Sequence, residues 1–295
     1  MENATDIFVR LRPRLLGVAY RMLGSLAEAE DVVQDVWLGW NAIDPDSVAD
    51  PQGWLITTTS RRAIDRLRRA KLEREHYVGI WLPEPVLTEG PPTPEQTQEA
   101  ASDLSVAFLA VLERLSPEAR AAYLLREVFD SDYSEIARIL DKSEAACRQI
   151  VHRAKSQLRE ERPRYLVPAH VHQRVVQRLA AAWAEGDLEA MRELMADSAT
   201  LVGDGGGRVS SFPEPMVGGA RIAQLLYAPL LRRGNSVRLV PTLINGRLGL
   251  LRYFDEDLES VQSFVTDGTR ITHVHVQRNP EKLTHIQSGL ATLLH

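Results

Sequence analysis

Residues 133–152 read YSEIARILDKSEAACRQIVH, and this stretch decides the fold of the middle of the chain. Asp132 and Glu135 have capping-box spacing at the start of a first helix, and Ser143 is of the type that caps a second. A tight turn, residues 141–143, separates the two helices. Ala137 is small enough to let them approach closely, and we expect four apolar side chains to hold them together: Ile136, Leu140, Cys147 and Val151. The pattern predicts a helix-turn-helix.

The second helix of this motif presents polar side chains outward. In a helix-turn-helix this helix lies in the major groove of DNA, and its start can also receive a phosphate on free backbone N–H groups. Arg148 and Gln149 are of the types that read base edges, while Arg153 and Lys155 suit phosphates. The alternative is a helical hairpin with a solvated basic face. A single inward cysteine, Cys147, is interpreted as a small apolar core residue.

Length and composition limit the classes of protein to which the chain can belong. The 295 residues suit two or three domains, and 44% hydrophobic with 25% charged residues is typical of a folded chain. No apolar run is long enough to cross a bilayer, and the N-terminus has no secretory signal pattern. One cysteine cannot form an internal disulfide, which favours the reducing cytoplasm.

The charge is distributed unevenly along the chain. The net charge is −5, yet residues 61–74 hold seven Arg or Lys against two acids, while residues 83–103 hold five acids and no Arg or Lys. A local basic stripe attracts phosphates because binding releases condensed counterions. The local cluster of positive charge therefore predicts a nucleic-acid partner, although the negative net charge by itself argues against one.

Periodicity divides the chain into a helical part and a mixed part. Residues 1–76 and 104–162 have helical spacing, with a tryptophan-bearing apolar stripe over 28–40 and a basic helix over 54–75. A proline-rich stretch, 82–103, reads as a linker. Beyond Pro163 we expect helices over 170–184 and 187–195. Strands are expected over 199–202, 237–244, 248–254, 260–265 and 271–276, with a hairpin at Asn245-Gly246. The order of elements favours an α+β domain with a meandering antiparallel sheet.

Three blocks in this order resemble sigma-70-type sigma factors of the extracytoplasmic-function group. DVVQDVWL (31–38) resembles the helix that binds core RNA polymerase, GWLITTTSRRAIDRLRR (53–69) resembles the promoter −10 helix, and 104–162 is similar to the −35-binding domain. The resemblance implies a polymerase subunit with polymerase contacts at Asp31, Val32, Gln34, Asp35, Trp37 and Leu38. It implies −10 contacts at Trp54, Arg61, Arg62, Arg66, Arg68 and Arg69. It implies −35 contacts at Tyr133, Ser143, Glu144, Arg148, Gln149, His152, Arg153 and Lys155. Asp65 is expected to pair with Arg61 or Arg69 within its helix.

A narrower resemblance involves WLPEP, DGGGR and NPEKL. These motifs are similar to the signature of a subgroup that carries a SnoaL-like (NTF2-like) extension instead of relying on a separate anti-sigma protein. They imply a regulatory set: Trp81, Leu82, Pro83, Glu84, Pro85, Asp204, Gly205, Gly206, Gly207, Arg208, Asn279, Pro280, Glu281, Lys282 and Leu283. Arg208 and Glu281 depart from the subgroup's usual lysine and aspartate. The implied fold is multidomain: two all-α sigma-factor domains (1–80 and 104–162), a linker (81–103) and an α+β NTF2-like, SnoaL-like cone (168–295).

Other readings of the C-terminal part stay open. Asp204, Arg208, His273 and His275 are of the types that make an acid–base set, and the two histidines could pair on a metal, but no third ligand is identifiable from spacing. We therefore expect no catalytic residue, no metal and no cofactor. Two rivals are a one-component ligand-sensing transcription factor and an NTF2-like enzyme fused to a DNA-binding module. The first rival leaves the helices over 28–40 and 54–75 without a role.

Overall fold

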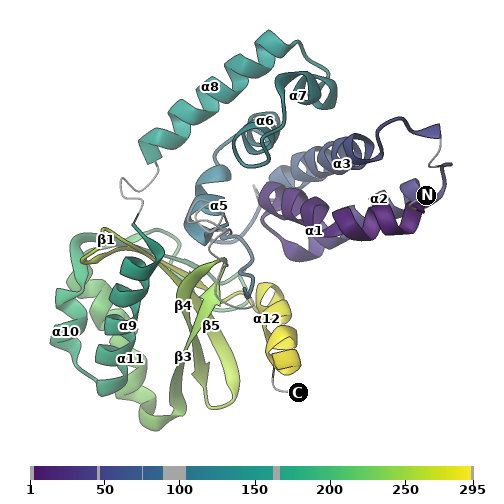
Figure 1. Ribbon diagram of the computed structural model, residues 1–295. Coiled ribbons are helices and arrows are strands. Elements are labelled where there is room, and N and C mark those ends of the chain that lie inside the picture. Colours follow the sequence, from purple (N-terminus) through teal and green to yellow (C-terminus); the bar gives the residue numbers. More distant parts are fainter. Residues whose placement is uncertain (1–2, 45–46, 75, 89–103, 162–166, 294–295) are drawn as a thin grey trace. The chain divides into compact units, whose positions relative to one another are not determined.

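The computed structural model describes residues 3–44, 47–74, 76–88, 104–161 and 167–293 (Figure 1). They form two compact units, one made of Met1–His76 and Val111–Arg162, the other of Tyr77–Ala110 and Pro163–His295. The proline-rich part of the predicted linker, residues 89–103, lies outside the described residues. Within the described residues, no helix is both long enough and apolar enough to span a bilayer.

The first unit is all α-helical. It contains α1 (Ala4–Leu23), α2 (Leu26–Asn41), α3 (Pro51–Arg74), α6 (Pro117–Glu127), α7 (Tyr133–Leu140) and α8 (Glu144–Glu161). The short helix α5 (Val106–Leu112) begins in the second unit and ends in the first. Trp40 is fully buried, and its indole N–H donates to the carbonyl of Ala4 at 2.8 Å, which ties the end of α2 to the start of α1.

The predicted helix starts are confirmed by side-chain caps. Asp132 accepts from the N–H of Glu135, and Ser143 accepts from the N–H of Ala146. Ser116 caps α6 in the same way, accepting from the N–H of Ala119 with Pro117 in the first turn. Each cap satisfies a backbone donor that has no partner within its helix. The basic helix begins at Pro51, a few residues before the predicted start, and residues 45–46 of the preceding loop lie outside the described part.

The second unit contains a six-stranded sheet in the order β2-β1-β6-β5-β4-β3. Its strands are β1 (Met195–Asp204), β2 (Met216–Val217), β3 (Val237–Ile244), β4 (Arg247–Phe254), β5 (Asp257–Thr266) and β6 (Ile271–Gln277). β3 to β6 form the predicted antiparallel meander, and Asn245-Gly246 makes the predicted hairpin with positive φ at both residues. The expectation of a wholly antiparallel sheet is wrong, because β1 lies parallel to β6. After β1 the chain passes through β2 and a helix and enters the opposite edge of the sheet as β3. The meander then runs back strand by strand until β6 lies beside β1. Periodicity does not reveal this connection.

Helices cover both faces of this sheet (Figure 1). One face packs on α9 (Ala169–Glu185), α10 (Leu188–Glu193) and α11 (Gly219–Arg233) around Trp183, Leu250 and Phe264. The other face carries α12 (Pro280–Leu293) and the end of the 77–88 segment around Leu251, Tyr253 and Leu283. Leu250 and Leu251 enter different cores because successive strand residues point to opposite faces. The sequence reading did not anticipate α11, α12 or the short strand β2.

Candidate functional site

The helix-turn-helix is held together by buried side chains of α7 and α8. Ile136, Cys147 and Val151 are buried as expected, but Leu140 is only half-buried and Ile139 is buried in its place. Ile139 and Leu140 are both neighbours of Ile136 on the helix surface, so spacing alone does not decide which of the two is buried. Asp141 ends α7 in the left-handed conformation (φ 53°) and makes the turn tight.

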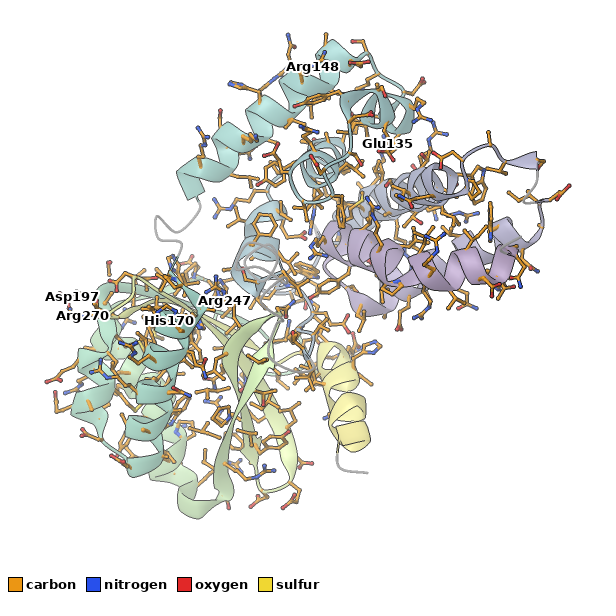
Figure 2. All side chains as sticks on the ribbon, in the orientation of Figure 1. Glu135, Arg148, His170, Asp197, Arg247 and Arg270 are labelled. Carbon is orange, nitrogen blue, oxygen red and sulfur yellow. The ribbon has the colours of Figure 1, made fainter. Side chains whose placement is uncertain are left out.

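The outer face of α8 is exposed at Glu144, Arg148, Gln149, His152 and Arg153. Figure 2 shows Arg148 on this helix and Glu135 on α7. Arg148 pairs with Glu144 one turn earlier at 2.8 Å, and its guanidinium lies 4.9 Å from the centre of the Tyr133 ring. Such a surface pair is weak, so it does not prevent the arginine from exchanging partners.

Two further predicted −35 contacts, Lys155 and Ser143, also have structural partners. Lys155 pairs with Glu127 of α6 at 2.7 Å. Ser143 caps α8 with its hydroxyl, which places the start of the helix rather than offering a free side chain. The DNA roles of both residues stay predictions.

α2 separates the predicted polymerase contacts into a buried and an exposed set. Val32 is buried at 4% exposure and belongs to the core, and Trp37 is half-buried against Phe8 with ring centres 4.8 Å apart. The other four lie exposed on the outer face: Asp31, Gln34, Asp35 and Leu38. Leu38 is 60% exposed and adds an apolar side chain to this acidic face.

The basic helix α3 is partly neutralised by α2. Arg62 pairs with Asp35 at 3.3 Å, and Arg66 pairs with Asp31 at 3.5 Å. The predicted partners of Asp65 are wrong: it pairs with Arg68, three residues on, at 3.0 Å.

Trp54, at the start of α3, is half-buried. Its ring centre lies 5.4 Å from that of Trp40, the core tryptophan of α2. The packing is typical of a helix-start anchor, and the predicted part of Trp54 in a −10 pocket stays a prediction.

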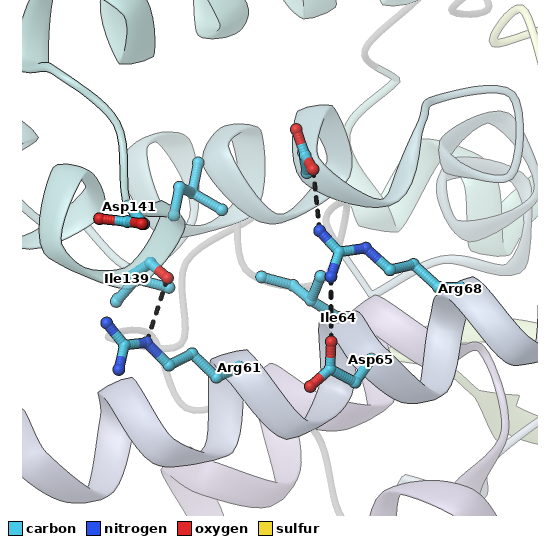
Figure 3. Close-up of a pocket in the computed structure, with 8 residues that line it drawn as sticks. Arg61, Ile64, Asp65, Arg68, Ile139 and Asp141 are labelled. Atoms are coloured by element: carbon cyan, nitrogen blue, oxygen red, sulfur yellow. Dashed lines mark hydrogen bonds and ion pairs between the residues drawn. The ribbon is translucent and has the colours of Figure 1, made fainter.

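Arg61 and Arg68 face the helix-turn-helix part of the same unit across a cavity of about 560 Å³ (Figure 3). Arg61 donates to the backbone carbonyls of Arg138 and Ile139 at the end of α7. Arg68 pairs with Glu118 at the start of α6 at 2.8 Å. Two side chains that the resemblance assigns to promoter contacts are therefore engaged within the protein.

A buried carboxylate organises the second unit. Asp204, at the end of β1, has no exposed surface and accepts from Tyr77 hydroxyl (2.6 Å), the Leu82 N–H (2.9 Å) and the Lys282 ammonium (2.6 Å). Gln277 adds a weaker contact at 3.3 Å. Burial raises the pKa of Tyr77, and the hydrogen bond to this carboxylate raises it further. We call Tyr77, Leu82, Asp204, Gln277 and Lys282 the anchor cluster.

The glycines after Asp204 form a tight loop. Gly206 and Gly207 both have positive φ (61° and 70°), and a Cβ on Gly206 would lie 2.4 Å from the side chain of Asn279. Asn279 in turn donates to the Tyr77 hydroxyl at 3.0 Å. The DGGGR and NPEKL motifs therefore meet. Their two departures from the subgroup pattern, Arg208 and Glu281, pair with each other at 3.0 Å on the surface.

The WLPEP segment lies in the second unit and docks onto the anchor cluster. Leu82 is buried at 2% exposure, and its carbonyl accepts from Lys282 at 2.7 Å. The same ammonium lies 4.1 Å from the centre of the Trp81 ring. Trp81 and Leu82 of the predicted regulatory set therefore pack within the second unit. Sequence reasoning missed Tyr77 and Gln277. The alternation of β6 places Gln277 on the same face as His275 and was the only available signal for it.

The two histidines of β6 do not form a site of their own. His275 is buried beneath Leu82, Pro83 and Pro85, and its Nδ1 has no hydrogen-bond partner among the described residues. Burial lowers the pKa of His275 to about 4 and also lowers that of His273. No group of three His, Cys, Asp or Glu side chains in the described residues is arranged to hold a metal.

Comparison with known proteins matches both helical blocks. Residues 7–73 match the family model Sigma-70 region 2, and residues 105–158 match Sigma-70, region 4. The ECF RNA polymerase sigma factor SigJ of Mycobacterium tuberculosis is 37% identical, over 94% of this chain and 92% of SigJ. The probable ECF RNA polymerase sigma factor SigI of the same species is 27% identical, over 95% and 94% of the two chains.

A solved structure matches the whole arrangement of elements. The crystal structure of SigJ from Mycobacterium tuberculosis superposes with a TM-score of 0.75 at 32% identity, covering 94% of this chain and 96% of that one. The match extends through the C-terminal sheet domain as well as the helical blocks. With two sigma-70 regions in order and a full-length relative above 30% identity, the chain belongs to the sigma-70 family, in the extracytoplasmic-function group of RNA polymerase sigma factors with a SnoaL-like C-terminal extension.

Proposed function

We propose that this sigma factor binds core RNA polymerase through the exposed face of α2 and reads promoter DNA with α3 and α8. The exposed acids and Leu38 of α2 supply a mixed apolar and acidic docking surface. The arginines of α3 supply phosphate contacts near the −10 element, and the outer face of α8 supplies base and phosphate contacts at the −35 element. The partners are core enzyme and promoter DNA, and the compartment is the cytoplasm.

The C-terminal domain modulates this activity in cis, without a catalytic role and without need of a separate anti-sigma protein. The observation that carries the proposal is the anchor cluster. Its hydrogen bonds hold the segment 77–88, which follows α3, on the C-terminal domain. Val106, at the start of α5, packs on Ile244 and Leu251 of the same domain. Both ends of the connection between the −10 and −35 modules are therefore held by one domain.

This grip limits how far the two DNA-reading modules can separate, because the chain between them is bound at each end. Promoter binding requires the modules to reach two separate DNA elements. Release of the 77–88 segment would lengthen the free connection and favour that state. The domain thus biases an equilibrium between closed and polymerase-competent forms.

Run-off transcription with purified core enzyme tests the proposal. The full chain is compared with Leu82→Glu, which places a charge where the segment is buried, and with a chain truncated after residue 165. We expect both changes to alter promoter output, since both abolish the grip. The control is Arg221→Gln, a change at an exposed position of α11 outside the predicted regulatory set. Unchanged output from both would reject modulation in cis, and absence of transcription from every form would reject the sigma-factor assignment of the DNA-reading helices.

A further inference from the structure

The C-terminal domain contains a cavity that the anchor cluster does not use. It has a volume of about 350 Å³ and lies between the sheet and α11, on the face that carries Leu201 and Val276. Asp204 and Gln277 point to the opposite face, because they alternate with Gly203, Val276 and Arg278 along β1 and β6. The cavity and the linker-binding face are thus two separate surfaces of one sheet.

The floor of the cavity carries two arginines and one glutamate. Arg252 is 8% exposed and pairs with Glu259 at 2.6 Å, and Arg278 pairs with the other oxygen of the same carboxylate at 2.7 Å. Burial opposes ionisation of Glu259, but the two guanidinium groups hold the pKa of its carboxyl below the usual value. The three ionised groups leave one positive charge in excess at a half-enclosed site.

The last turn of α11 adds more positive charge. Arg232 and Arg233 both line the cavity, and Glu259 is the only acid among its lining residues. Arg233 is exposed, and its guanidinium lies 4.5 Å from the ring centre of Phe254. A cation held over an aromatic ring remains available to an anion on its open side.

The rest of the lining is apolar. Leu225 and Pro229 of α11, Phe254 of β4 and Phe212 of the loop after β1 enclose the volume. Phe212 is 37% exposed, so part of its ring remains in contact with solvent. Apolar walls with a few convergent charged groups are typical of sites for small molecules of this volume.

We propose that this cavity binds a small amphipathic carboxylate, with its apolar body between α11 and the sheet and its carboxylate among Arg278, Arg232 and Arg233. Guanidinium groups match carboxylates in geometry and charge. The carboxylate brings negative charge to a lining that holds four arginines against one glutamate. A neutral analogue of the same ligand would leave this excess positive charge without a counter-charge.

Isothermal titration calorimetry on the full chain tests the site with octanoate, decanoate and 4-phenylbutyrate, and with 1-decanol as a neutral match for decanoate. We expect saturable one-to-one binding of at least one acid, at least tenfold tighter for decanoate than for 1-decanol. Arg278→Gln should weaken binding at least fivefold. Ala228→Phe, which fills the cavity without changing its charge, should weaken it by a similar factor.

The matched control is Arg221→Gln, the same charge change on the exposed part of α11 outside the cavity, which should stay within twofold of the parent. Arg233→Gln repeats the charge test at an exposed position if Arg278→Gln fails to fold, as judged by circular dichroism. The proposal is wrong if no acid binds saturably, if the alcohol binds as tightly as the acid, or if filling the cavity leaves binding unchanged. The outcome is independent of polymerase binding.

Discussion

Asp204 and Arg208 lie four residues apart in one loop, yet their ion pairs are in opposite environments. The Asp204–Lys282 pair has 0% and 12% of its two side chains exposed, whereas Arg208 and Glu281 are 68% and 66% exposed. Breaking a buried pair leaves a charge without compensation, while a surface pair is screened by water. The two pairs therefore make a matched comparison within the predicted regulatory set.

Asp204→Asn should lower the stability of the C-terminal domain by about 3 kcal/mol, because it leaves the Lys282 ammonium without its counter-charge. Arg208→Ala should cost less than about 1 kcal/mol. Differential scanning calorimetry of the full chain, following the transition of this domain, measures both. Equal shifts of the two melting temperatures would contradict the assignment of the buried pair as the anchor.

Two buried histidines make the same domain sensitive to acid. Burial lowers the pKa of His172 to about 4, and that of His275 to about 4, from an ordinary value of 6.5. The unfolded chain therefore binds more protons than the folded one between pH 6.5 and 4. Stability is fully present above pH 6.5 and is lost as the pH falls through that window.

At pH 5 each of these histidines should cost the folded domain about 2 kcal/mol relative to pH 7. His275→Leu should remove about half of this loss, because leucine has no proton to bind and the Nδ1 atom of His275 lacks a partner among the described residues. Urea unfolding at pH 7, 6 and 5 gives the slopes. Parallel slopes for parent and variant would show that His275 does not titrate on unfolding.

We expect the exposed side chains of α8 to fall into two groups, those that contact bases and those that contact phosphates. Arg148→Ala should relax the preference at one −35 base pair by about 1–3 kcal/mol, since a bidentate arginine contact discriminates by that amount. Arg153→Ala should weaken all sequences alike and lower the slope of log affinity against log salt by about 1. Binding of the polymerase-bound protein to a series of −35 variants, at several salt concentrations, separates the two. Uniform losses for both variants would reject the roles.

The helices α7 and α12 show which features of an element can be predicted from sequence and which cannot. The caps at Asp132 and Ser143 and the burial of Cys147 are local consequences of spacing, and they are confirmed. Leu140 was expected inward, but whether Ile139 or Leu140 is buried depends on where α8 crosses α7. The sequence shows the NPEKL motif, but it does not show that a helix, α12, begins within this motif. The apolar side chains of α12 pack against strand residues that are distant in the sequence, so no local pattern marks the helix.

Across the first unit, two of the predicted −10 contacts, Arg61 and Arg68, are bound to other parts of the same unit. Glu118 binds Arg68 and also lies 3.4 Å from Lys142, and the hydrogen bond from Arg68 is the main reason that the pKa of Glu118 is lowered. An exposed pair contributes up to about 1 kcal/mol. Loss of Glu118 should therefore shift the unit modestly toward a state in which α3 is free.

Glu118→Gln should tighten binding of a single-stranded −10 oligonucleotide about two- to fivefold, since this range corresponds to about 0.4–1 kcal/mol. Fluorescence anisotropy at constant salt measures the change. Asp130→Asn, which removes the charge of the exposed partner of Arg126, is the control and should have no effect. A Glu118→Gln protein that binds no more tightly than the control would show that Arg68 is not restrained by Glu118.

Spacing by itself determined the helical blocks, their caps, the helix-turn-helix, the hairpin at Asn245-Gly246 and the family motifs, because these depend on residues close together in the chain. Only the tertiary structure decided that Tyr77 and Gln277 join Asp204 and Lys282, that β1 lies parallel to β6, and that four arginines surround an apolar cavity. Those groups are separated by tens to hundreds of residues. A buried charge finds its partner through the packing of the sheet and its helices, and that packing has no local signal in the sequence.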